Sequence, residues 1–445
     1  MAGEAVGAQR RGFERARGLD EGDGNDSIVD ELLRLTARSA AQRAKGNPVP
    51  ALIEVEAARL LLDQYTDIGH ADLARALPEI LRQWARAYEL TDHASEAVVL
   101  LQESFELAER SDDAPSARSA AGHLAWIHAA AGRHAPAAKW VERAARHPKV
   151  VSDADTDGIL GHALRLADEL HTAAALELLT TIDLARIHPE GWAAVQFTIA
   201  HLSTRATAPA ALDELLAEES SHPVGVSRSG ANLTLLTHAK TRLHLLTGDA
   251  AGAIHVTRGL PDQPGLMVAR SAALLAADEN RAVLAIARQT RPLVEGHPRW
   301  RTKLAAVEGV ALARIGAQDA ARELAERVVE AVPRLGLYSS LTLLSAHDIE
   351  QFLGLADPTL AAPIRERVLA HLSHRVVLRL SLLTRREREV LRLVLTGDSA
   401  DRIAARLFVS RNTVKSQLAS INRKLGVTSR EQLIALARAA PLDAG

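Results

Sequence analysis

The chain of 445 residues contains no cysteine, two methionines and few aromatic residues, which make up 3% of the sequence. Without cysteine, it has no disulfide, no thiolate ligand for zinc and no cysteine nucleophile. No apolar run reaches the ~20 residues that a transmembrane helix needs. We therefore expect a soluble, cytoplasmic protein without membrane contact.

Motifs for catalysis and cofactor binding are also missing. No Gly-x4-Gly-Lys-Ser/Thr loop occurs, so that phosphate cradle is excluded. No residues pair a nucleophile with a base, and the eighteen histidines lack carboxylate partners at zinc-protease spacing. We expect no catalytic residue, no metal and no cofactor, and we expect the histidines to lie on helix surfaces.

Most of the chain is rich in alanine and leucine. Amphipathic segments recur from Ile28 to about Leu372, separated by short turns, and no alternating strand pattern interrupts them. The segment from Pro363 to Leu380 has no internal glycine or proline, which favours a stiff helical connector. The sequence predicts an all-α fold.

The helical region also repeats. A turn residue is followed five positions later by alanine at Gly132, Gly248 and Gly316, and more loosely at Asp92. Small residues let two helices approach closely, so these alanines are expected where second helices cross their neighbours. The predicted crossing residues are Ala97, Ala137, Ala175, Ala211, Ala253, Ala321 and Ala361, with a degenerate unit around Ala282.

The C-terminal segment carries helix start signals in close succession. Thr384 with Glu387 forms a capping box for a helix over about 385–395, with Gly397 after its end. Ser399 and Ser410 can cap two further helices, and Thr428 with Glu431 can open a fourth. This order predicts a compact helix-turn-helix module.

The third of these helices indicates the function. Val414, Leu418, Ile421 and Leu425 repeat at helical spacing and form one apolar stripe. The opposite face is short, polar and basic, which suits the major groove of double-stranded DNA. The candidate DNA-binding residues are Arg411, Asn412, Thr413, Lys415, Ser416, Ala419, Arg423 and Lys424.

Charge is concentrated in this module. Residues 381–440 hold twelve Lys or Arg against five Asp or Glu, a balance of +7. Since the whole chain carries −2, the other residues carry −9. Positive charge is thus gathered where phosphates would bind.

The module resembles the LuxR-type helix-turn-helix, the C-terminal DNA-binding domain of many bacterial transcription regulators. The resemblance covers about sixty residues. The matching positions are Thr384, Arg386, Glu387, Val390, Leu391, Gly397, Ile403, Ala404, Leu407, Ser410, Thr413, Val414, Lys415, Lys424, Leu425 and Gly426. Arg402, Gln417 and Asn422 depart from the family's usual glutamate, histidine and aromatic residue.

The resemblance implies a role for several residues. The lysine after Thr-Val, here Lys415, lies at the groove in such domains. Their fourth helix commonly pairs two protomers, which implies a dimer contact at or near Leu433, Ile434 and Ala437.

The remaining helices resemble a degenerate tetratricopeptide array, whose ideal period is ~34 residues. Stacked helix pairs of that kind present a concave face for a peptide or small ligand. MalT-like regulators of the LuxR type place a nucleotide-binding domain before such an array. The chain resembles the array and DNA-binding portions alone, and we expect no control by ATP.

We therefore expect five parts in the chain. They are a disordered tail over 1–27, a helical-repeat sensor or interaction domain over 28–372, a connector over 373–380, the helix-turn-helix domain over 381–440 and a tail over 441–445.

The favoured function is a sequence-specific transcription regulator, more often an activator, that binds double-stranded DNA as a homodimer. Its array would sense an unknown ligand or protein, and RNA polymerase is a further candidate partner. The alternative is an interaction scaffold or anti-regulator with weak, non-specific DNA binding.

Overall fold

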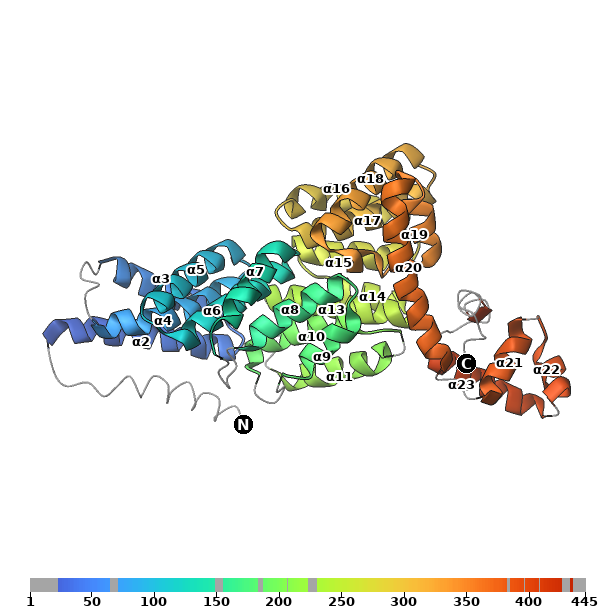
Figure 1. The fold of residues 1–445 in the computed structure, drawn as a ribbon, viewed down its shortest axis with the longest axis horizontal. Helices are drawn as coiled ribbons and strands as arrows, with labels where there is room; N and C mark the ends of the chain where they lie inside the picture. The colour runs from blue at the N-terminus through green and yellow to red at the C-terminus, as the bar shows by residue number, and fades with distance from the viewer. Residues whose placement is uncertain are drawn as a thin grey trace. The chain divides into compact units, whose positions relative to one another are not determined.

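The structure is a computed structural model. It describes residues 23–64, 71–148, 155–182, 187–205, 207–222, 230–381, 385–395, 397–407, 409–425 and 433–434. Regular structure in these residues is helical throughout, which confirms the predicted all-α fold (Figure 1). None of the described helices is both long and apolar enough to cross a bilayer.

The helices form two compact units. The first comprises residues 1–167, 171–198 and 216–238, and the second comprises 168–170, 199–215 and 239–445. In the first unit lie α2 (Asp23–Ala44), α3 (Pro48–Gln64), α4 (Ala71–Leu90), α5 (Ala94–Arg110), α6 (Ala114–Ala130), α7 (His134–Ala145), α8 (Thr156–Asp168), α9 (Thr172–Leu179) and η3 (Pro189–Gly191).

Four helices have residues in both units, namely α8, whose last residue Asp168 belongs to the second, and α10 (Trp192–Leu202), α11 (Ala208–Ser221) and α13 (Gly230–Thr247). The second unit continues with α14 (Ala250–Thr257), α15 (Pro264–Ala276), α16 (Asn280–Thr290), η4 (Arg291–Val294), α17 (Pro298–Arg314), α18 (Gln318–Leu335), η5 (Tyr338–Leu341), α19 (Ala346–Leu353) and α20 (Pro358–Ser381). It ends with α21 (Arg385–Leu395), α22 (Ala400–Leu407) and α23 (Arg411–Leu425).

The structure can be compared with two predicted segments, the N-terminal tail and the helical connector. Helix α2 begins at Asp23, so the expected tail over 1–27 extends about one turn too far. The connector expected to be helical is confirmed as a helix, because α20 runs without a break from Pro358 to Ser381.

One turn geometry recurs between helices of the array. Between α4 and α5, Asp92 has a φ of 65°, and the His93 amide donates to the Tyr88 carbonyl at 2.9 Å. This Schellman closure satisfies carbonyls at the end of the first helix. His93 then starts the next helix, because its carbonyl accepts from the Ala97 amide at 3.1 Å. The same pair of hydrogen bonds follows Asp112, Gly132, Leu170, Gly248, Asp278 and Gly316.

Each such turn places a fully buried residue in the same register. The fifth residue after the left-handed position is the fourth residue of the next helix, and its exposed fraction is 0%. These residues are Ala97, Ala117, Ala137, Ala175, Ala253, Val283 and Ala321. Of the predicted crossing alanines, Ala97, Ala137, Ala175, Ala253, Ala321 and Ala361 are buried, and Ala211 is half-buried.

The turns that the sequence analysis missed lack glycine. Asp112, Leu170 and Asp278 adopt the left-handed conformation despite their side chains. Aspartate tolerates this region better than most residues. The degenerate unit expected around Ala282 therefore has its buried position one residue later, at Val283.

Histidines of the array are not confined to helix surfaces, contrary to expectation. His123, His128 and His134 are all buried, and His123 Nε2 lies 2.7 Å from Glu89 Oε2. Glu89 also accepts from the indole of Trp126 at 2.9 Å. Among the residues that the structure describes, no cluster of His, Asp and Glu is placed to hold a metal ion.

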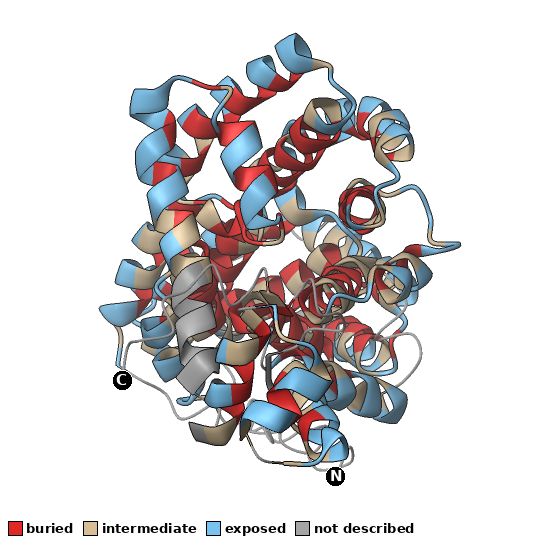
Figure 2. Ribbon diagram, turned by 90° about the vertical axis from the view of Figure 1, so that its right-hand side faces the viewer, coloured by how far each residue is buried: buried red, intermediate tan, exposed pale blue. Residues whose placement is uncertain are grey.

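Burial follows the inner sides of the helices (Figure 2). In the first unit, α8 approaches α6 so closely that Gly161 has no room for a side chain. A Cβ atom at Gly161 would lie 2.8 Å from the backbone of Ala125 and Trp126. Backbone cannot yield as a flexible side chain does, so this glycine is required by packing.

Gly161→Ala is expected to destabilise the chain by about 1–3 kcal/mol, because it overpacks the contact between α8 and α6. Thermal unfolding followed by circular dichroism measures the effect. Gly191→Ala is the matched control, since the nearest atom to its added Cβ lies 3.5 Å away. Equal melting temperatures for the two variants would contradict the close approach.

The second unit buries charge. Arg299 donates to both oxygens of Asp168, at 2.9 and 2.6 Å, and Arg242 donates to the Ala200 carbonyl at 2.8 Å. Lys303 lies close by with 8% exposure. Burial, together with Arg242 and Arg299, lowers the pKa of Lys303 from 10.5 to about 7, although Asp168 opposes the shift.

This depressed pKa predicts a pH dependence of stability. Between pH 7 and about 10 the unfolded chain holds a proton on Lys303 that the folded chain has lost. Stability from this group therefore rises with pH across that window. We expect the melting temperature of the native chain to rise more over this range than that of Lys303→Met. Lys139→Met, on exposed Lys139, serves as control and is expected to keep the native pH dependence.

Candidate nucleic-acid interface

The last three helices enclose a small apolar core of their own. Helix α21 spans Arg385–Leu395, as predicted, and α22 and α23 begin directly after the two predicted capping serines. The buried residues are Val390, Leu391, Val394, Ile403, Ala404, Val414, Ile421 and Leu433. They come from all three helices and from the residues after α23, so the core holds the module together.

The turn between α21 and α22 depends on glycine. Gly397 has a φ of 88°, and the Asp398 amide donates to the Leu393 carbonyl at 3.2 Å. Ser399 then caps α22, because its hydroxyl accepts from the Arg402 amide at 3.4 Å. The predicted glycine and serine roles are both confirmed.

The turn between α22 and α23 is equally short. The Val409 amide donates to the Ala404 carbonyl at 3.0 Å, and Ser410 begins the next helix. The Ser410 hydroxyl accepts from the Thr413 amide at 3.0 Å and lies 2.8 Å from the Thr413 hydroxyl. The predicted Ser410 cap is confirmed, whereas the Thr384 cap lies outside the described residues.

Helix α23 has the two faces that its sequence predicts. Val414 and Ile421 have 0% exposure, and Leu418 packs against the same core. The predicted outward residues with described side chains are exposed, namely Arg411, Asn412, Lys415, Ser416 and Ala419.

Three predicted contact residues need separate mention. Thr413 is half-buried, and its side chain contacts the Ser410 cap. Arg423 and Lys424 lie in the last turn of α23, and their side chains are outside the described part of the structure.

Two polar contacts that the sequence analysis missed orient the helices. Glu387, 6% exposed, accepts a hydrogen bond from the Ser420 hydroxyl at 2.8 Å and so ties α21 to α23. Arg386 donates to the Leu407 carbonyl at 2.7 Å at the end of α22. Ser420 is half-buried and precedes Ile421 of the apolar stripe, and its position next to that stripe was the available signal in the sequence.

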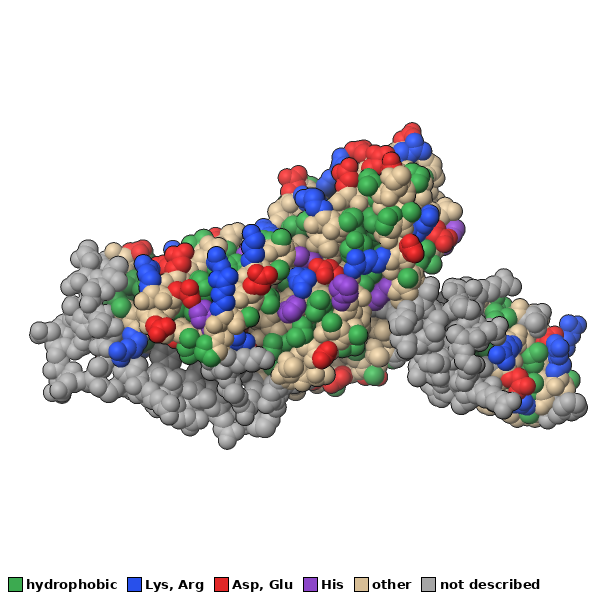
Figure 3. All heavy atoms as spheres, in the orientation of Figure 1, with side chains coloured by type: hydrophobic (Ala, Val, Ile, Leu, Met, Phe, Trp, Pro, Cys, Tyr) green, Lys and Arg blue, Asp and Glu red, His purple; other side chains and the backbone are tan. Residues whose placement is uncertain are grey.

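The exposed cations differ in their partners. Arg411 pairs with Asp401 at 3.1 Å, and Arg406 pairs with Asp398 at 2.7 Å. Lys415 makes no hydrogen bond or ion pair with a described residue, so its ammonium group is available to a ligand. Figure 3 shows Lys and Arg side chains on the surface of the described part of this domain.

The residues expected at a dimer contact are only partly described. Leu433 and Ile434 are helical. Leu433 is 2% exposed within the domain's own core, and Ile434 packs against that core. Ala437 lies outside the described residues. The dimer contact itself stays a prediction, and the side chain of Leu433 already has a structural role inside one domain.

The arrangement presents a capped helix whose outward side chains are small, amide-bearing or cationic. An α-helix fits the major groove of B-form DNA, where Asn and Lys side chains reach base edges and phosphates. Amides near the start of the helix favour a phosphate group. The geometry therefore suits a double helix better than a small ligand.

Comparison with known proteins agrees with this geometry. Residues 381–437 match the family described as "Bacterial regulatory proteins, luxR family". The spore germination protein GerE of Bacillus subtilis (strain 168) is 42% identical over 53 residues, which are 12% of this chain and 72% of that protein.

Two operon regulators each match over 57 residues. The probable csgAB operon transcriptional regulatory protein of Salmonella typhimurium is 42% identical over 57 residues, or 13% of this chain. The CsgBAC operon transcriptional regulatory protein of Escherichia coli (strain K12) matches equally. The chain spans only 26% of the length of each regulator. Through its C-terminal helix-turn-helix domain, the chain belongs to the LuxR family of bacterial regulatory proteins.

Proposed function

We propose that this chain is a sequence-specific transcription regulator that binds the major groove of DNA with α23. The observation that carries the proposal is the division of α23 into two faces. Val414 and Ile421 are buried, while Asn412, Lys415 and Ser416 are exposed. Two relatives named as operon transcriptional regulatory proteins support regulation as the outcome of binding.

We further propose that the regulator acts as an activator and binds DNA as a homodimer. A dimer doubles the contact area and reads two half-sites about one helical turn apart. Ile434 and Ala437, after α23, are the proposed contact residues. RNA polymerase is the proposed partner through which a bound activator would act.

The helical array is proposed to sense a ligand or protein. Its repeated turns and buried fourth residues support a tetratricopeptide-like stack, whose function in other proteins is to present a binding surface. A ligand changes DNA binding only if it binds the active and inactive conformations with different affinity.

Lys415→Ala is expected to weaken binding to a promoter duplex that genome-wide occupancy identifies as a target, at all salt concentrations. If Lys415 contacts a phosphate, the slope of log affinity against log salt falls by about one unit, because one fewer counterion is released. Ala419→Glu is expected to weaken binding further, since it places a carboxylate at the groove. Fluorescence anisotropy with labelled duplex at several salt concentrations measures both variants.

Arg327→Ala is the matched control for charge. Arg327 is an exposed cation on α18, paired with Glu323 at 2.5 Å, and its loss is expected to leave DNA affinity unchanged. Native affinity in both α23 variants would reject this helix as the reading element.

Genome-wide occupancy separates regulation from the scaffold alternative. Focused sites that share a roughly two-fold motif are expected for a dimeric regulator. Diffuse occupancy combined with strong protein partners would favour a scaffold with non-specific DNA binding.

A further inference from the structure

The first unit contains a polar cavity of about 320 Å³. Four segments line it: α4, the first two turns of α6, the first turn of α8, and the segment around η3 that includes Ile187, His188, Glu190 and Gly191. Its volume lies at the lower end of the range for small-molecule sites. We refer to it as the polar cavity.

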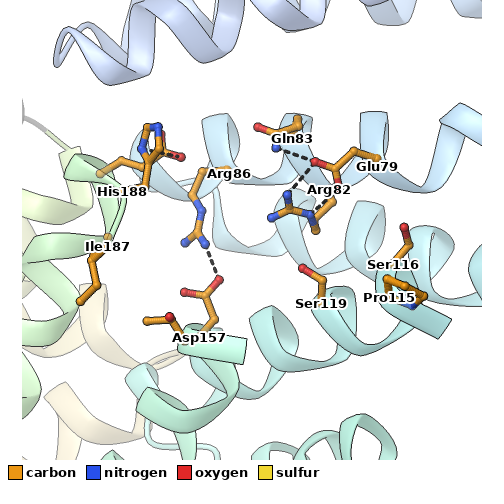
Figure 4. A pocket seen from close by; sticks show the side chains of 13 residues that line it. Glu79, Arg82, Gln83, Arg86, Pro115, Ser116, Ser119, Asp157, Ile187 and His188 are labelled. Atoms are coloured by element: carbon orange, nitrogen blue, oxygen red, sulfur yellow. Dashed lines mark hydrogen bonds and ion pairs between the residues drawn. The ribbon is translucent and has the colours of Figure 1, made fainter. Parts of the chain in front are cut away.

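Helix α4 supplies one wall. Glu79, Arg82, Gln83 and Arg86 recur at spacings of three and four, so they share one face of the helix. In Figure 4 the side chains of Arg82 and Arg86 extend from α4 toward Ser119 of α6 and Asp157 of α8. The cavity is therefore bounded by groups of both charges and by hydroxyl groups.

The two arginines have unused hydrogen-bond donors. A guanidinium carries five N–H donors. Arg82 uses two of them on Glu79, at 2.8 and 2.6 Å. Arg86 uses one on Glu89, at 2.8 Å, and one on Asp157. Three donors on each guanidinium thus have no acceptor among the described residues.

Ser119 adds a further polar group. It is 5% exposed and lines the cavity, and its hydroxyl makes no hydrogen bond with a described residue. A serine hydroxyl can donate one hydrogen bond. The side of the cavity formed by α4 and α6 can therefore donate hydrogen bonds to oxygen acceptors of a ligand.

Carboxylates balance the arginines on the other side. Burial alone would raise the pKa of Glu190, but Arg43, His188 and Arg86 lower it to about 2, so it is ionised. Arg43 holds one oxygen of Glu190 at 2.8 Å, and Asp157 receives one bond from Arg86. A carboxylate has about four lone-pair sites, so Glu190 and Asp157 retain acceptor capacity.

The charge balance decides between classes of ligand. The charged groups of the cavity and their direct partners are Arg43, Arg82, Arg86, Glu79, Glu89, Asp157 and Glu190. His188 also lines the cavity, and its Nδ1 lies 3.6 Å from Glu190. The three arginines face four carboxylates, and a protonated His188 brings the cations only to an equal number, so the cavity does not favour a multiply charged anion. A small molecule with one anionic and one cationic group can bind the donors on α4 and α6 and, at the same time, the carboxylates of Asp157 and Glu190.

We propose that the polar cavity binds a free α-amino acid as its zwitterion. The ligand carboxylate would accept from Arg82, Arg86 and Ser119, and its ammonium group would donate to Asp157 and Glu190. Charge-assisted hydrogen bonds of this kind are the strong ones. The inference rests on the proposed sensing role of the array and names the class of ligand that the array senses.

Thermal unfolding of the full chain with each common α-amino acid, one at a time at millimolar concentration, tests the proposal. At least one is expected to raise the melting temperature by roughly 3–6 °C at ten times its Kd. Its N-acetyl and carboxamide derivatives are expected to bind at least about tenfold more weakly in calorimetric titration, because each lacks one charge. No shift with any amino acid, equal binding of the blocked derivatives, or equal binding of orthophosphate would overturn it.

Arg82→Gln is expected to weaken binding of the amino acid by about 10- to 100-fold, because it removes charged hydrogen-bond donors. Arg38→Gln is the matched control, because Arg38 is an exposed residue of the same unit that pairs with Glu54 at 2.7 Å outside the cavity. Ser119→Ala removes one neutral donor without changing charge, and roughly 2- to 10-fold weaker binding is expected. Native affinity for the amino acid in both cavity variants would show that Arg82 and Ser119 do not contact the ligand.

DNA affinity with and without the amino acid separates the two proposals. If the amino acid binds but DNA affinity is unchanged, the cavity assignment stands and the sensing role falls. If the chain binds its promoter but no amino acid, the regulatory function stands and the cavity assignment falls.

Discussion

The array depends on one repeated constraint, the complete burial of the fourth residue of each helix that follows a left-handed turn. At Ala97, Ala137 and Ala321 the side chain is a single methyl group with no exposure. Side-chain size at a crossing sets how near two helices come. The Schellman closure before each helix fixes where that helix starts, and therefore which residue meets its neighbour.

Buried ion pairs occupy part of the interior of each unit, where large aromatic side chains are common in other proteins. Arg43 joins the Glu190 carboxylate and the Gln83 carbonyl in the first unit, and Arg299 holds Asp168 in the second. A buried ion pair adds little net stability but makes a wrong partner costly. With few aromatic residues available, such pairs give a stack of similar helices a preferred arrangement within each unit.

Periodicity and capping predicted the fold and the two faces of α23, because both depend on patterns that are local in sequence. The start of α23 after Ser410 and the burial of Val414 follow from short-range patterns. The contact between Glu387 and Ser420 joins residues 33 apart, and helical spacing carries no information about such a pair. The walls of the polar cavity come from four segments, so only the folded chain brings Arg82 near Ser119.

Leu170 shows that the repeated turn does not require one particular residue. A leucine in the left-handed region costs about 1–2 kcal/mol, yet it closes its turn with the same hydrogen bonds that glycine makes elsewhere. The surrounding helices offset that cost. The same backbone path is thus kept by glycine, aspartate and leucine within one chain, so the repeats share a shape although they do not share the residue at this position.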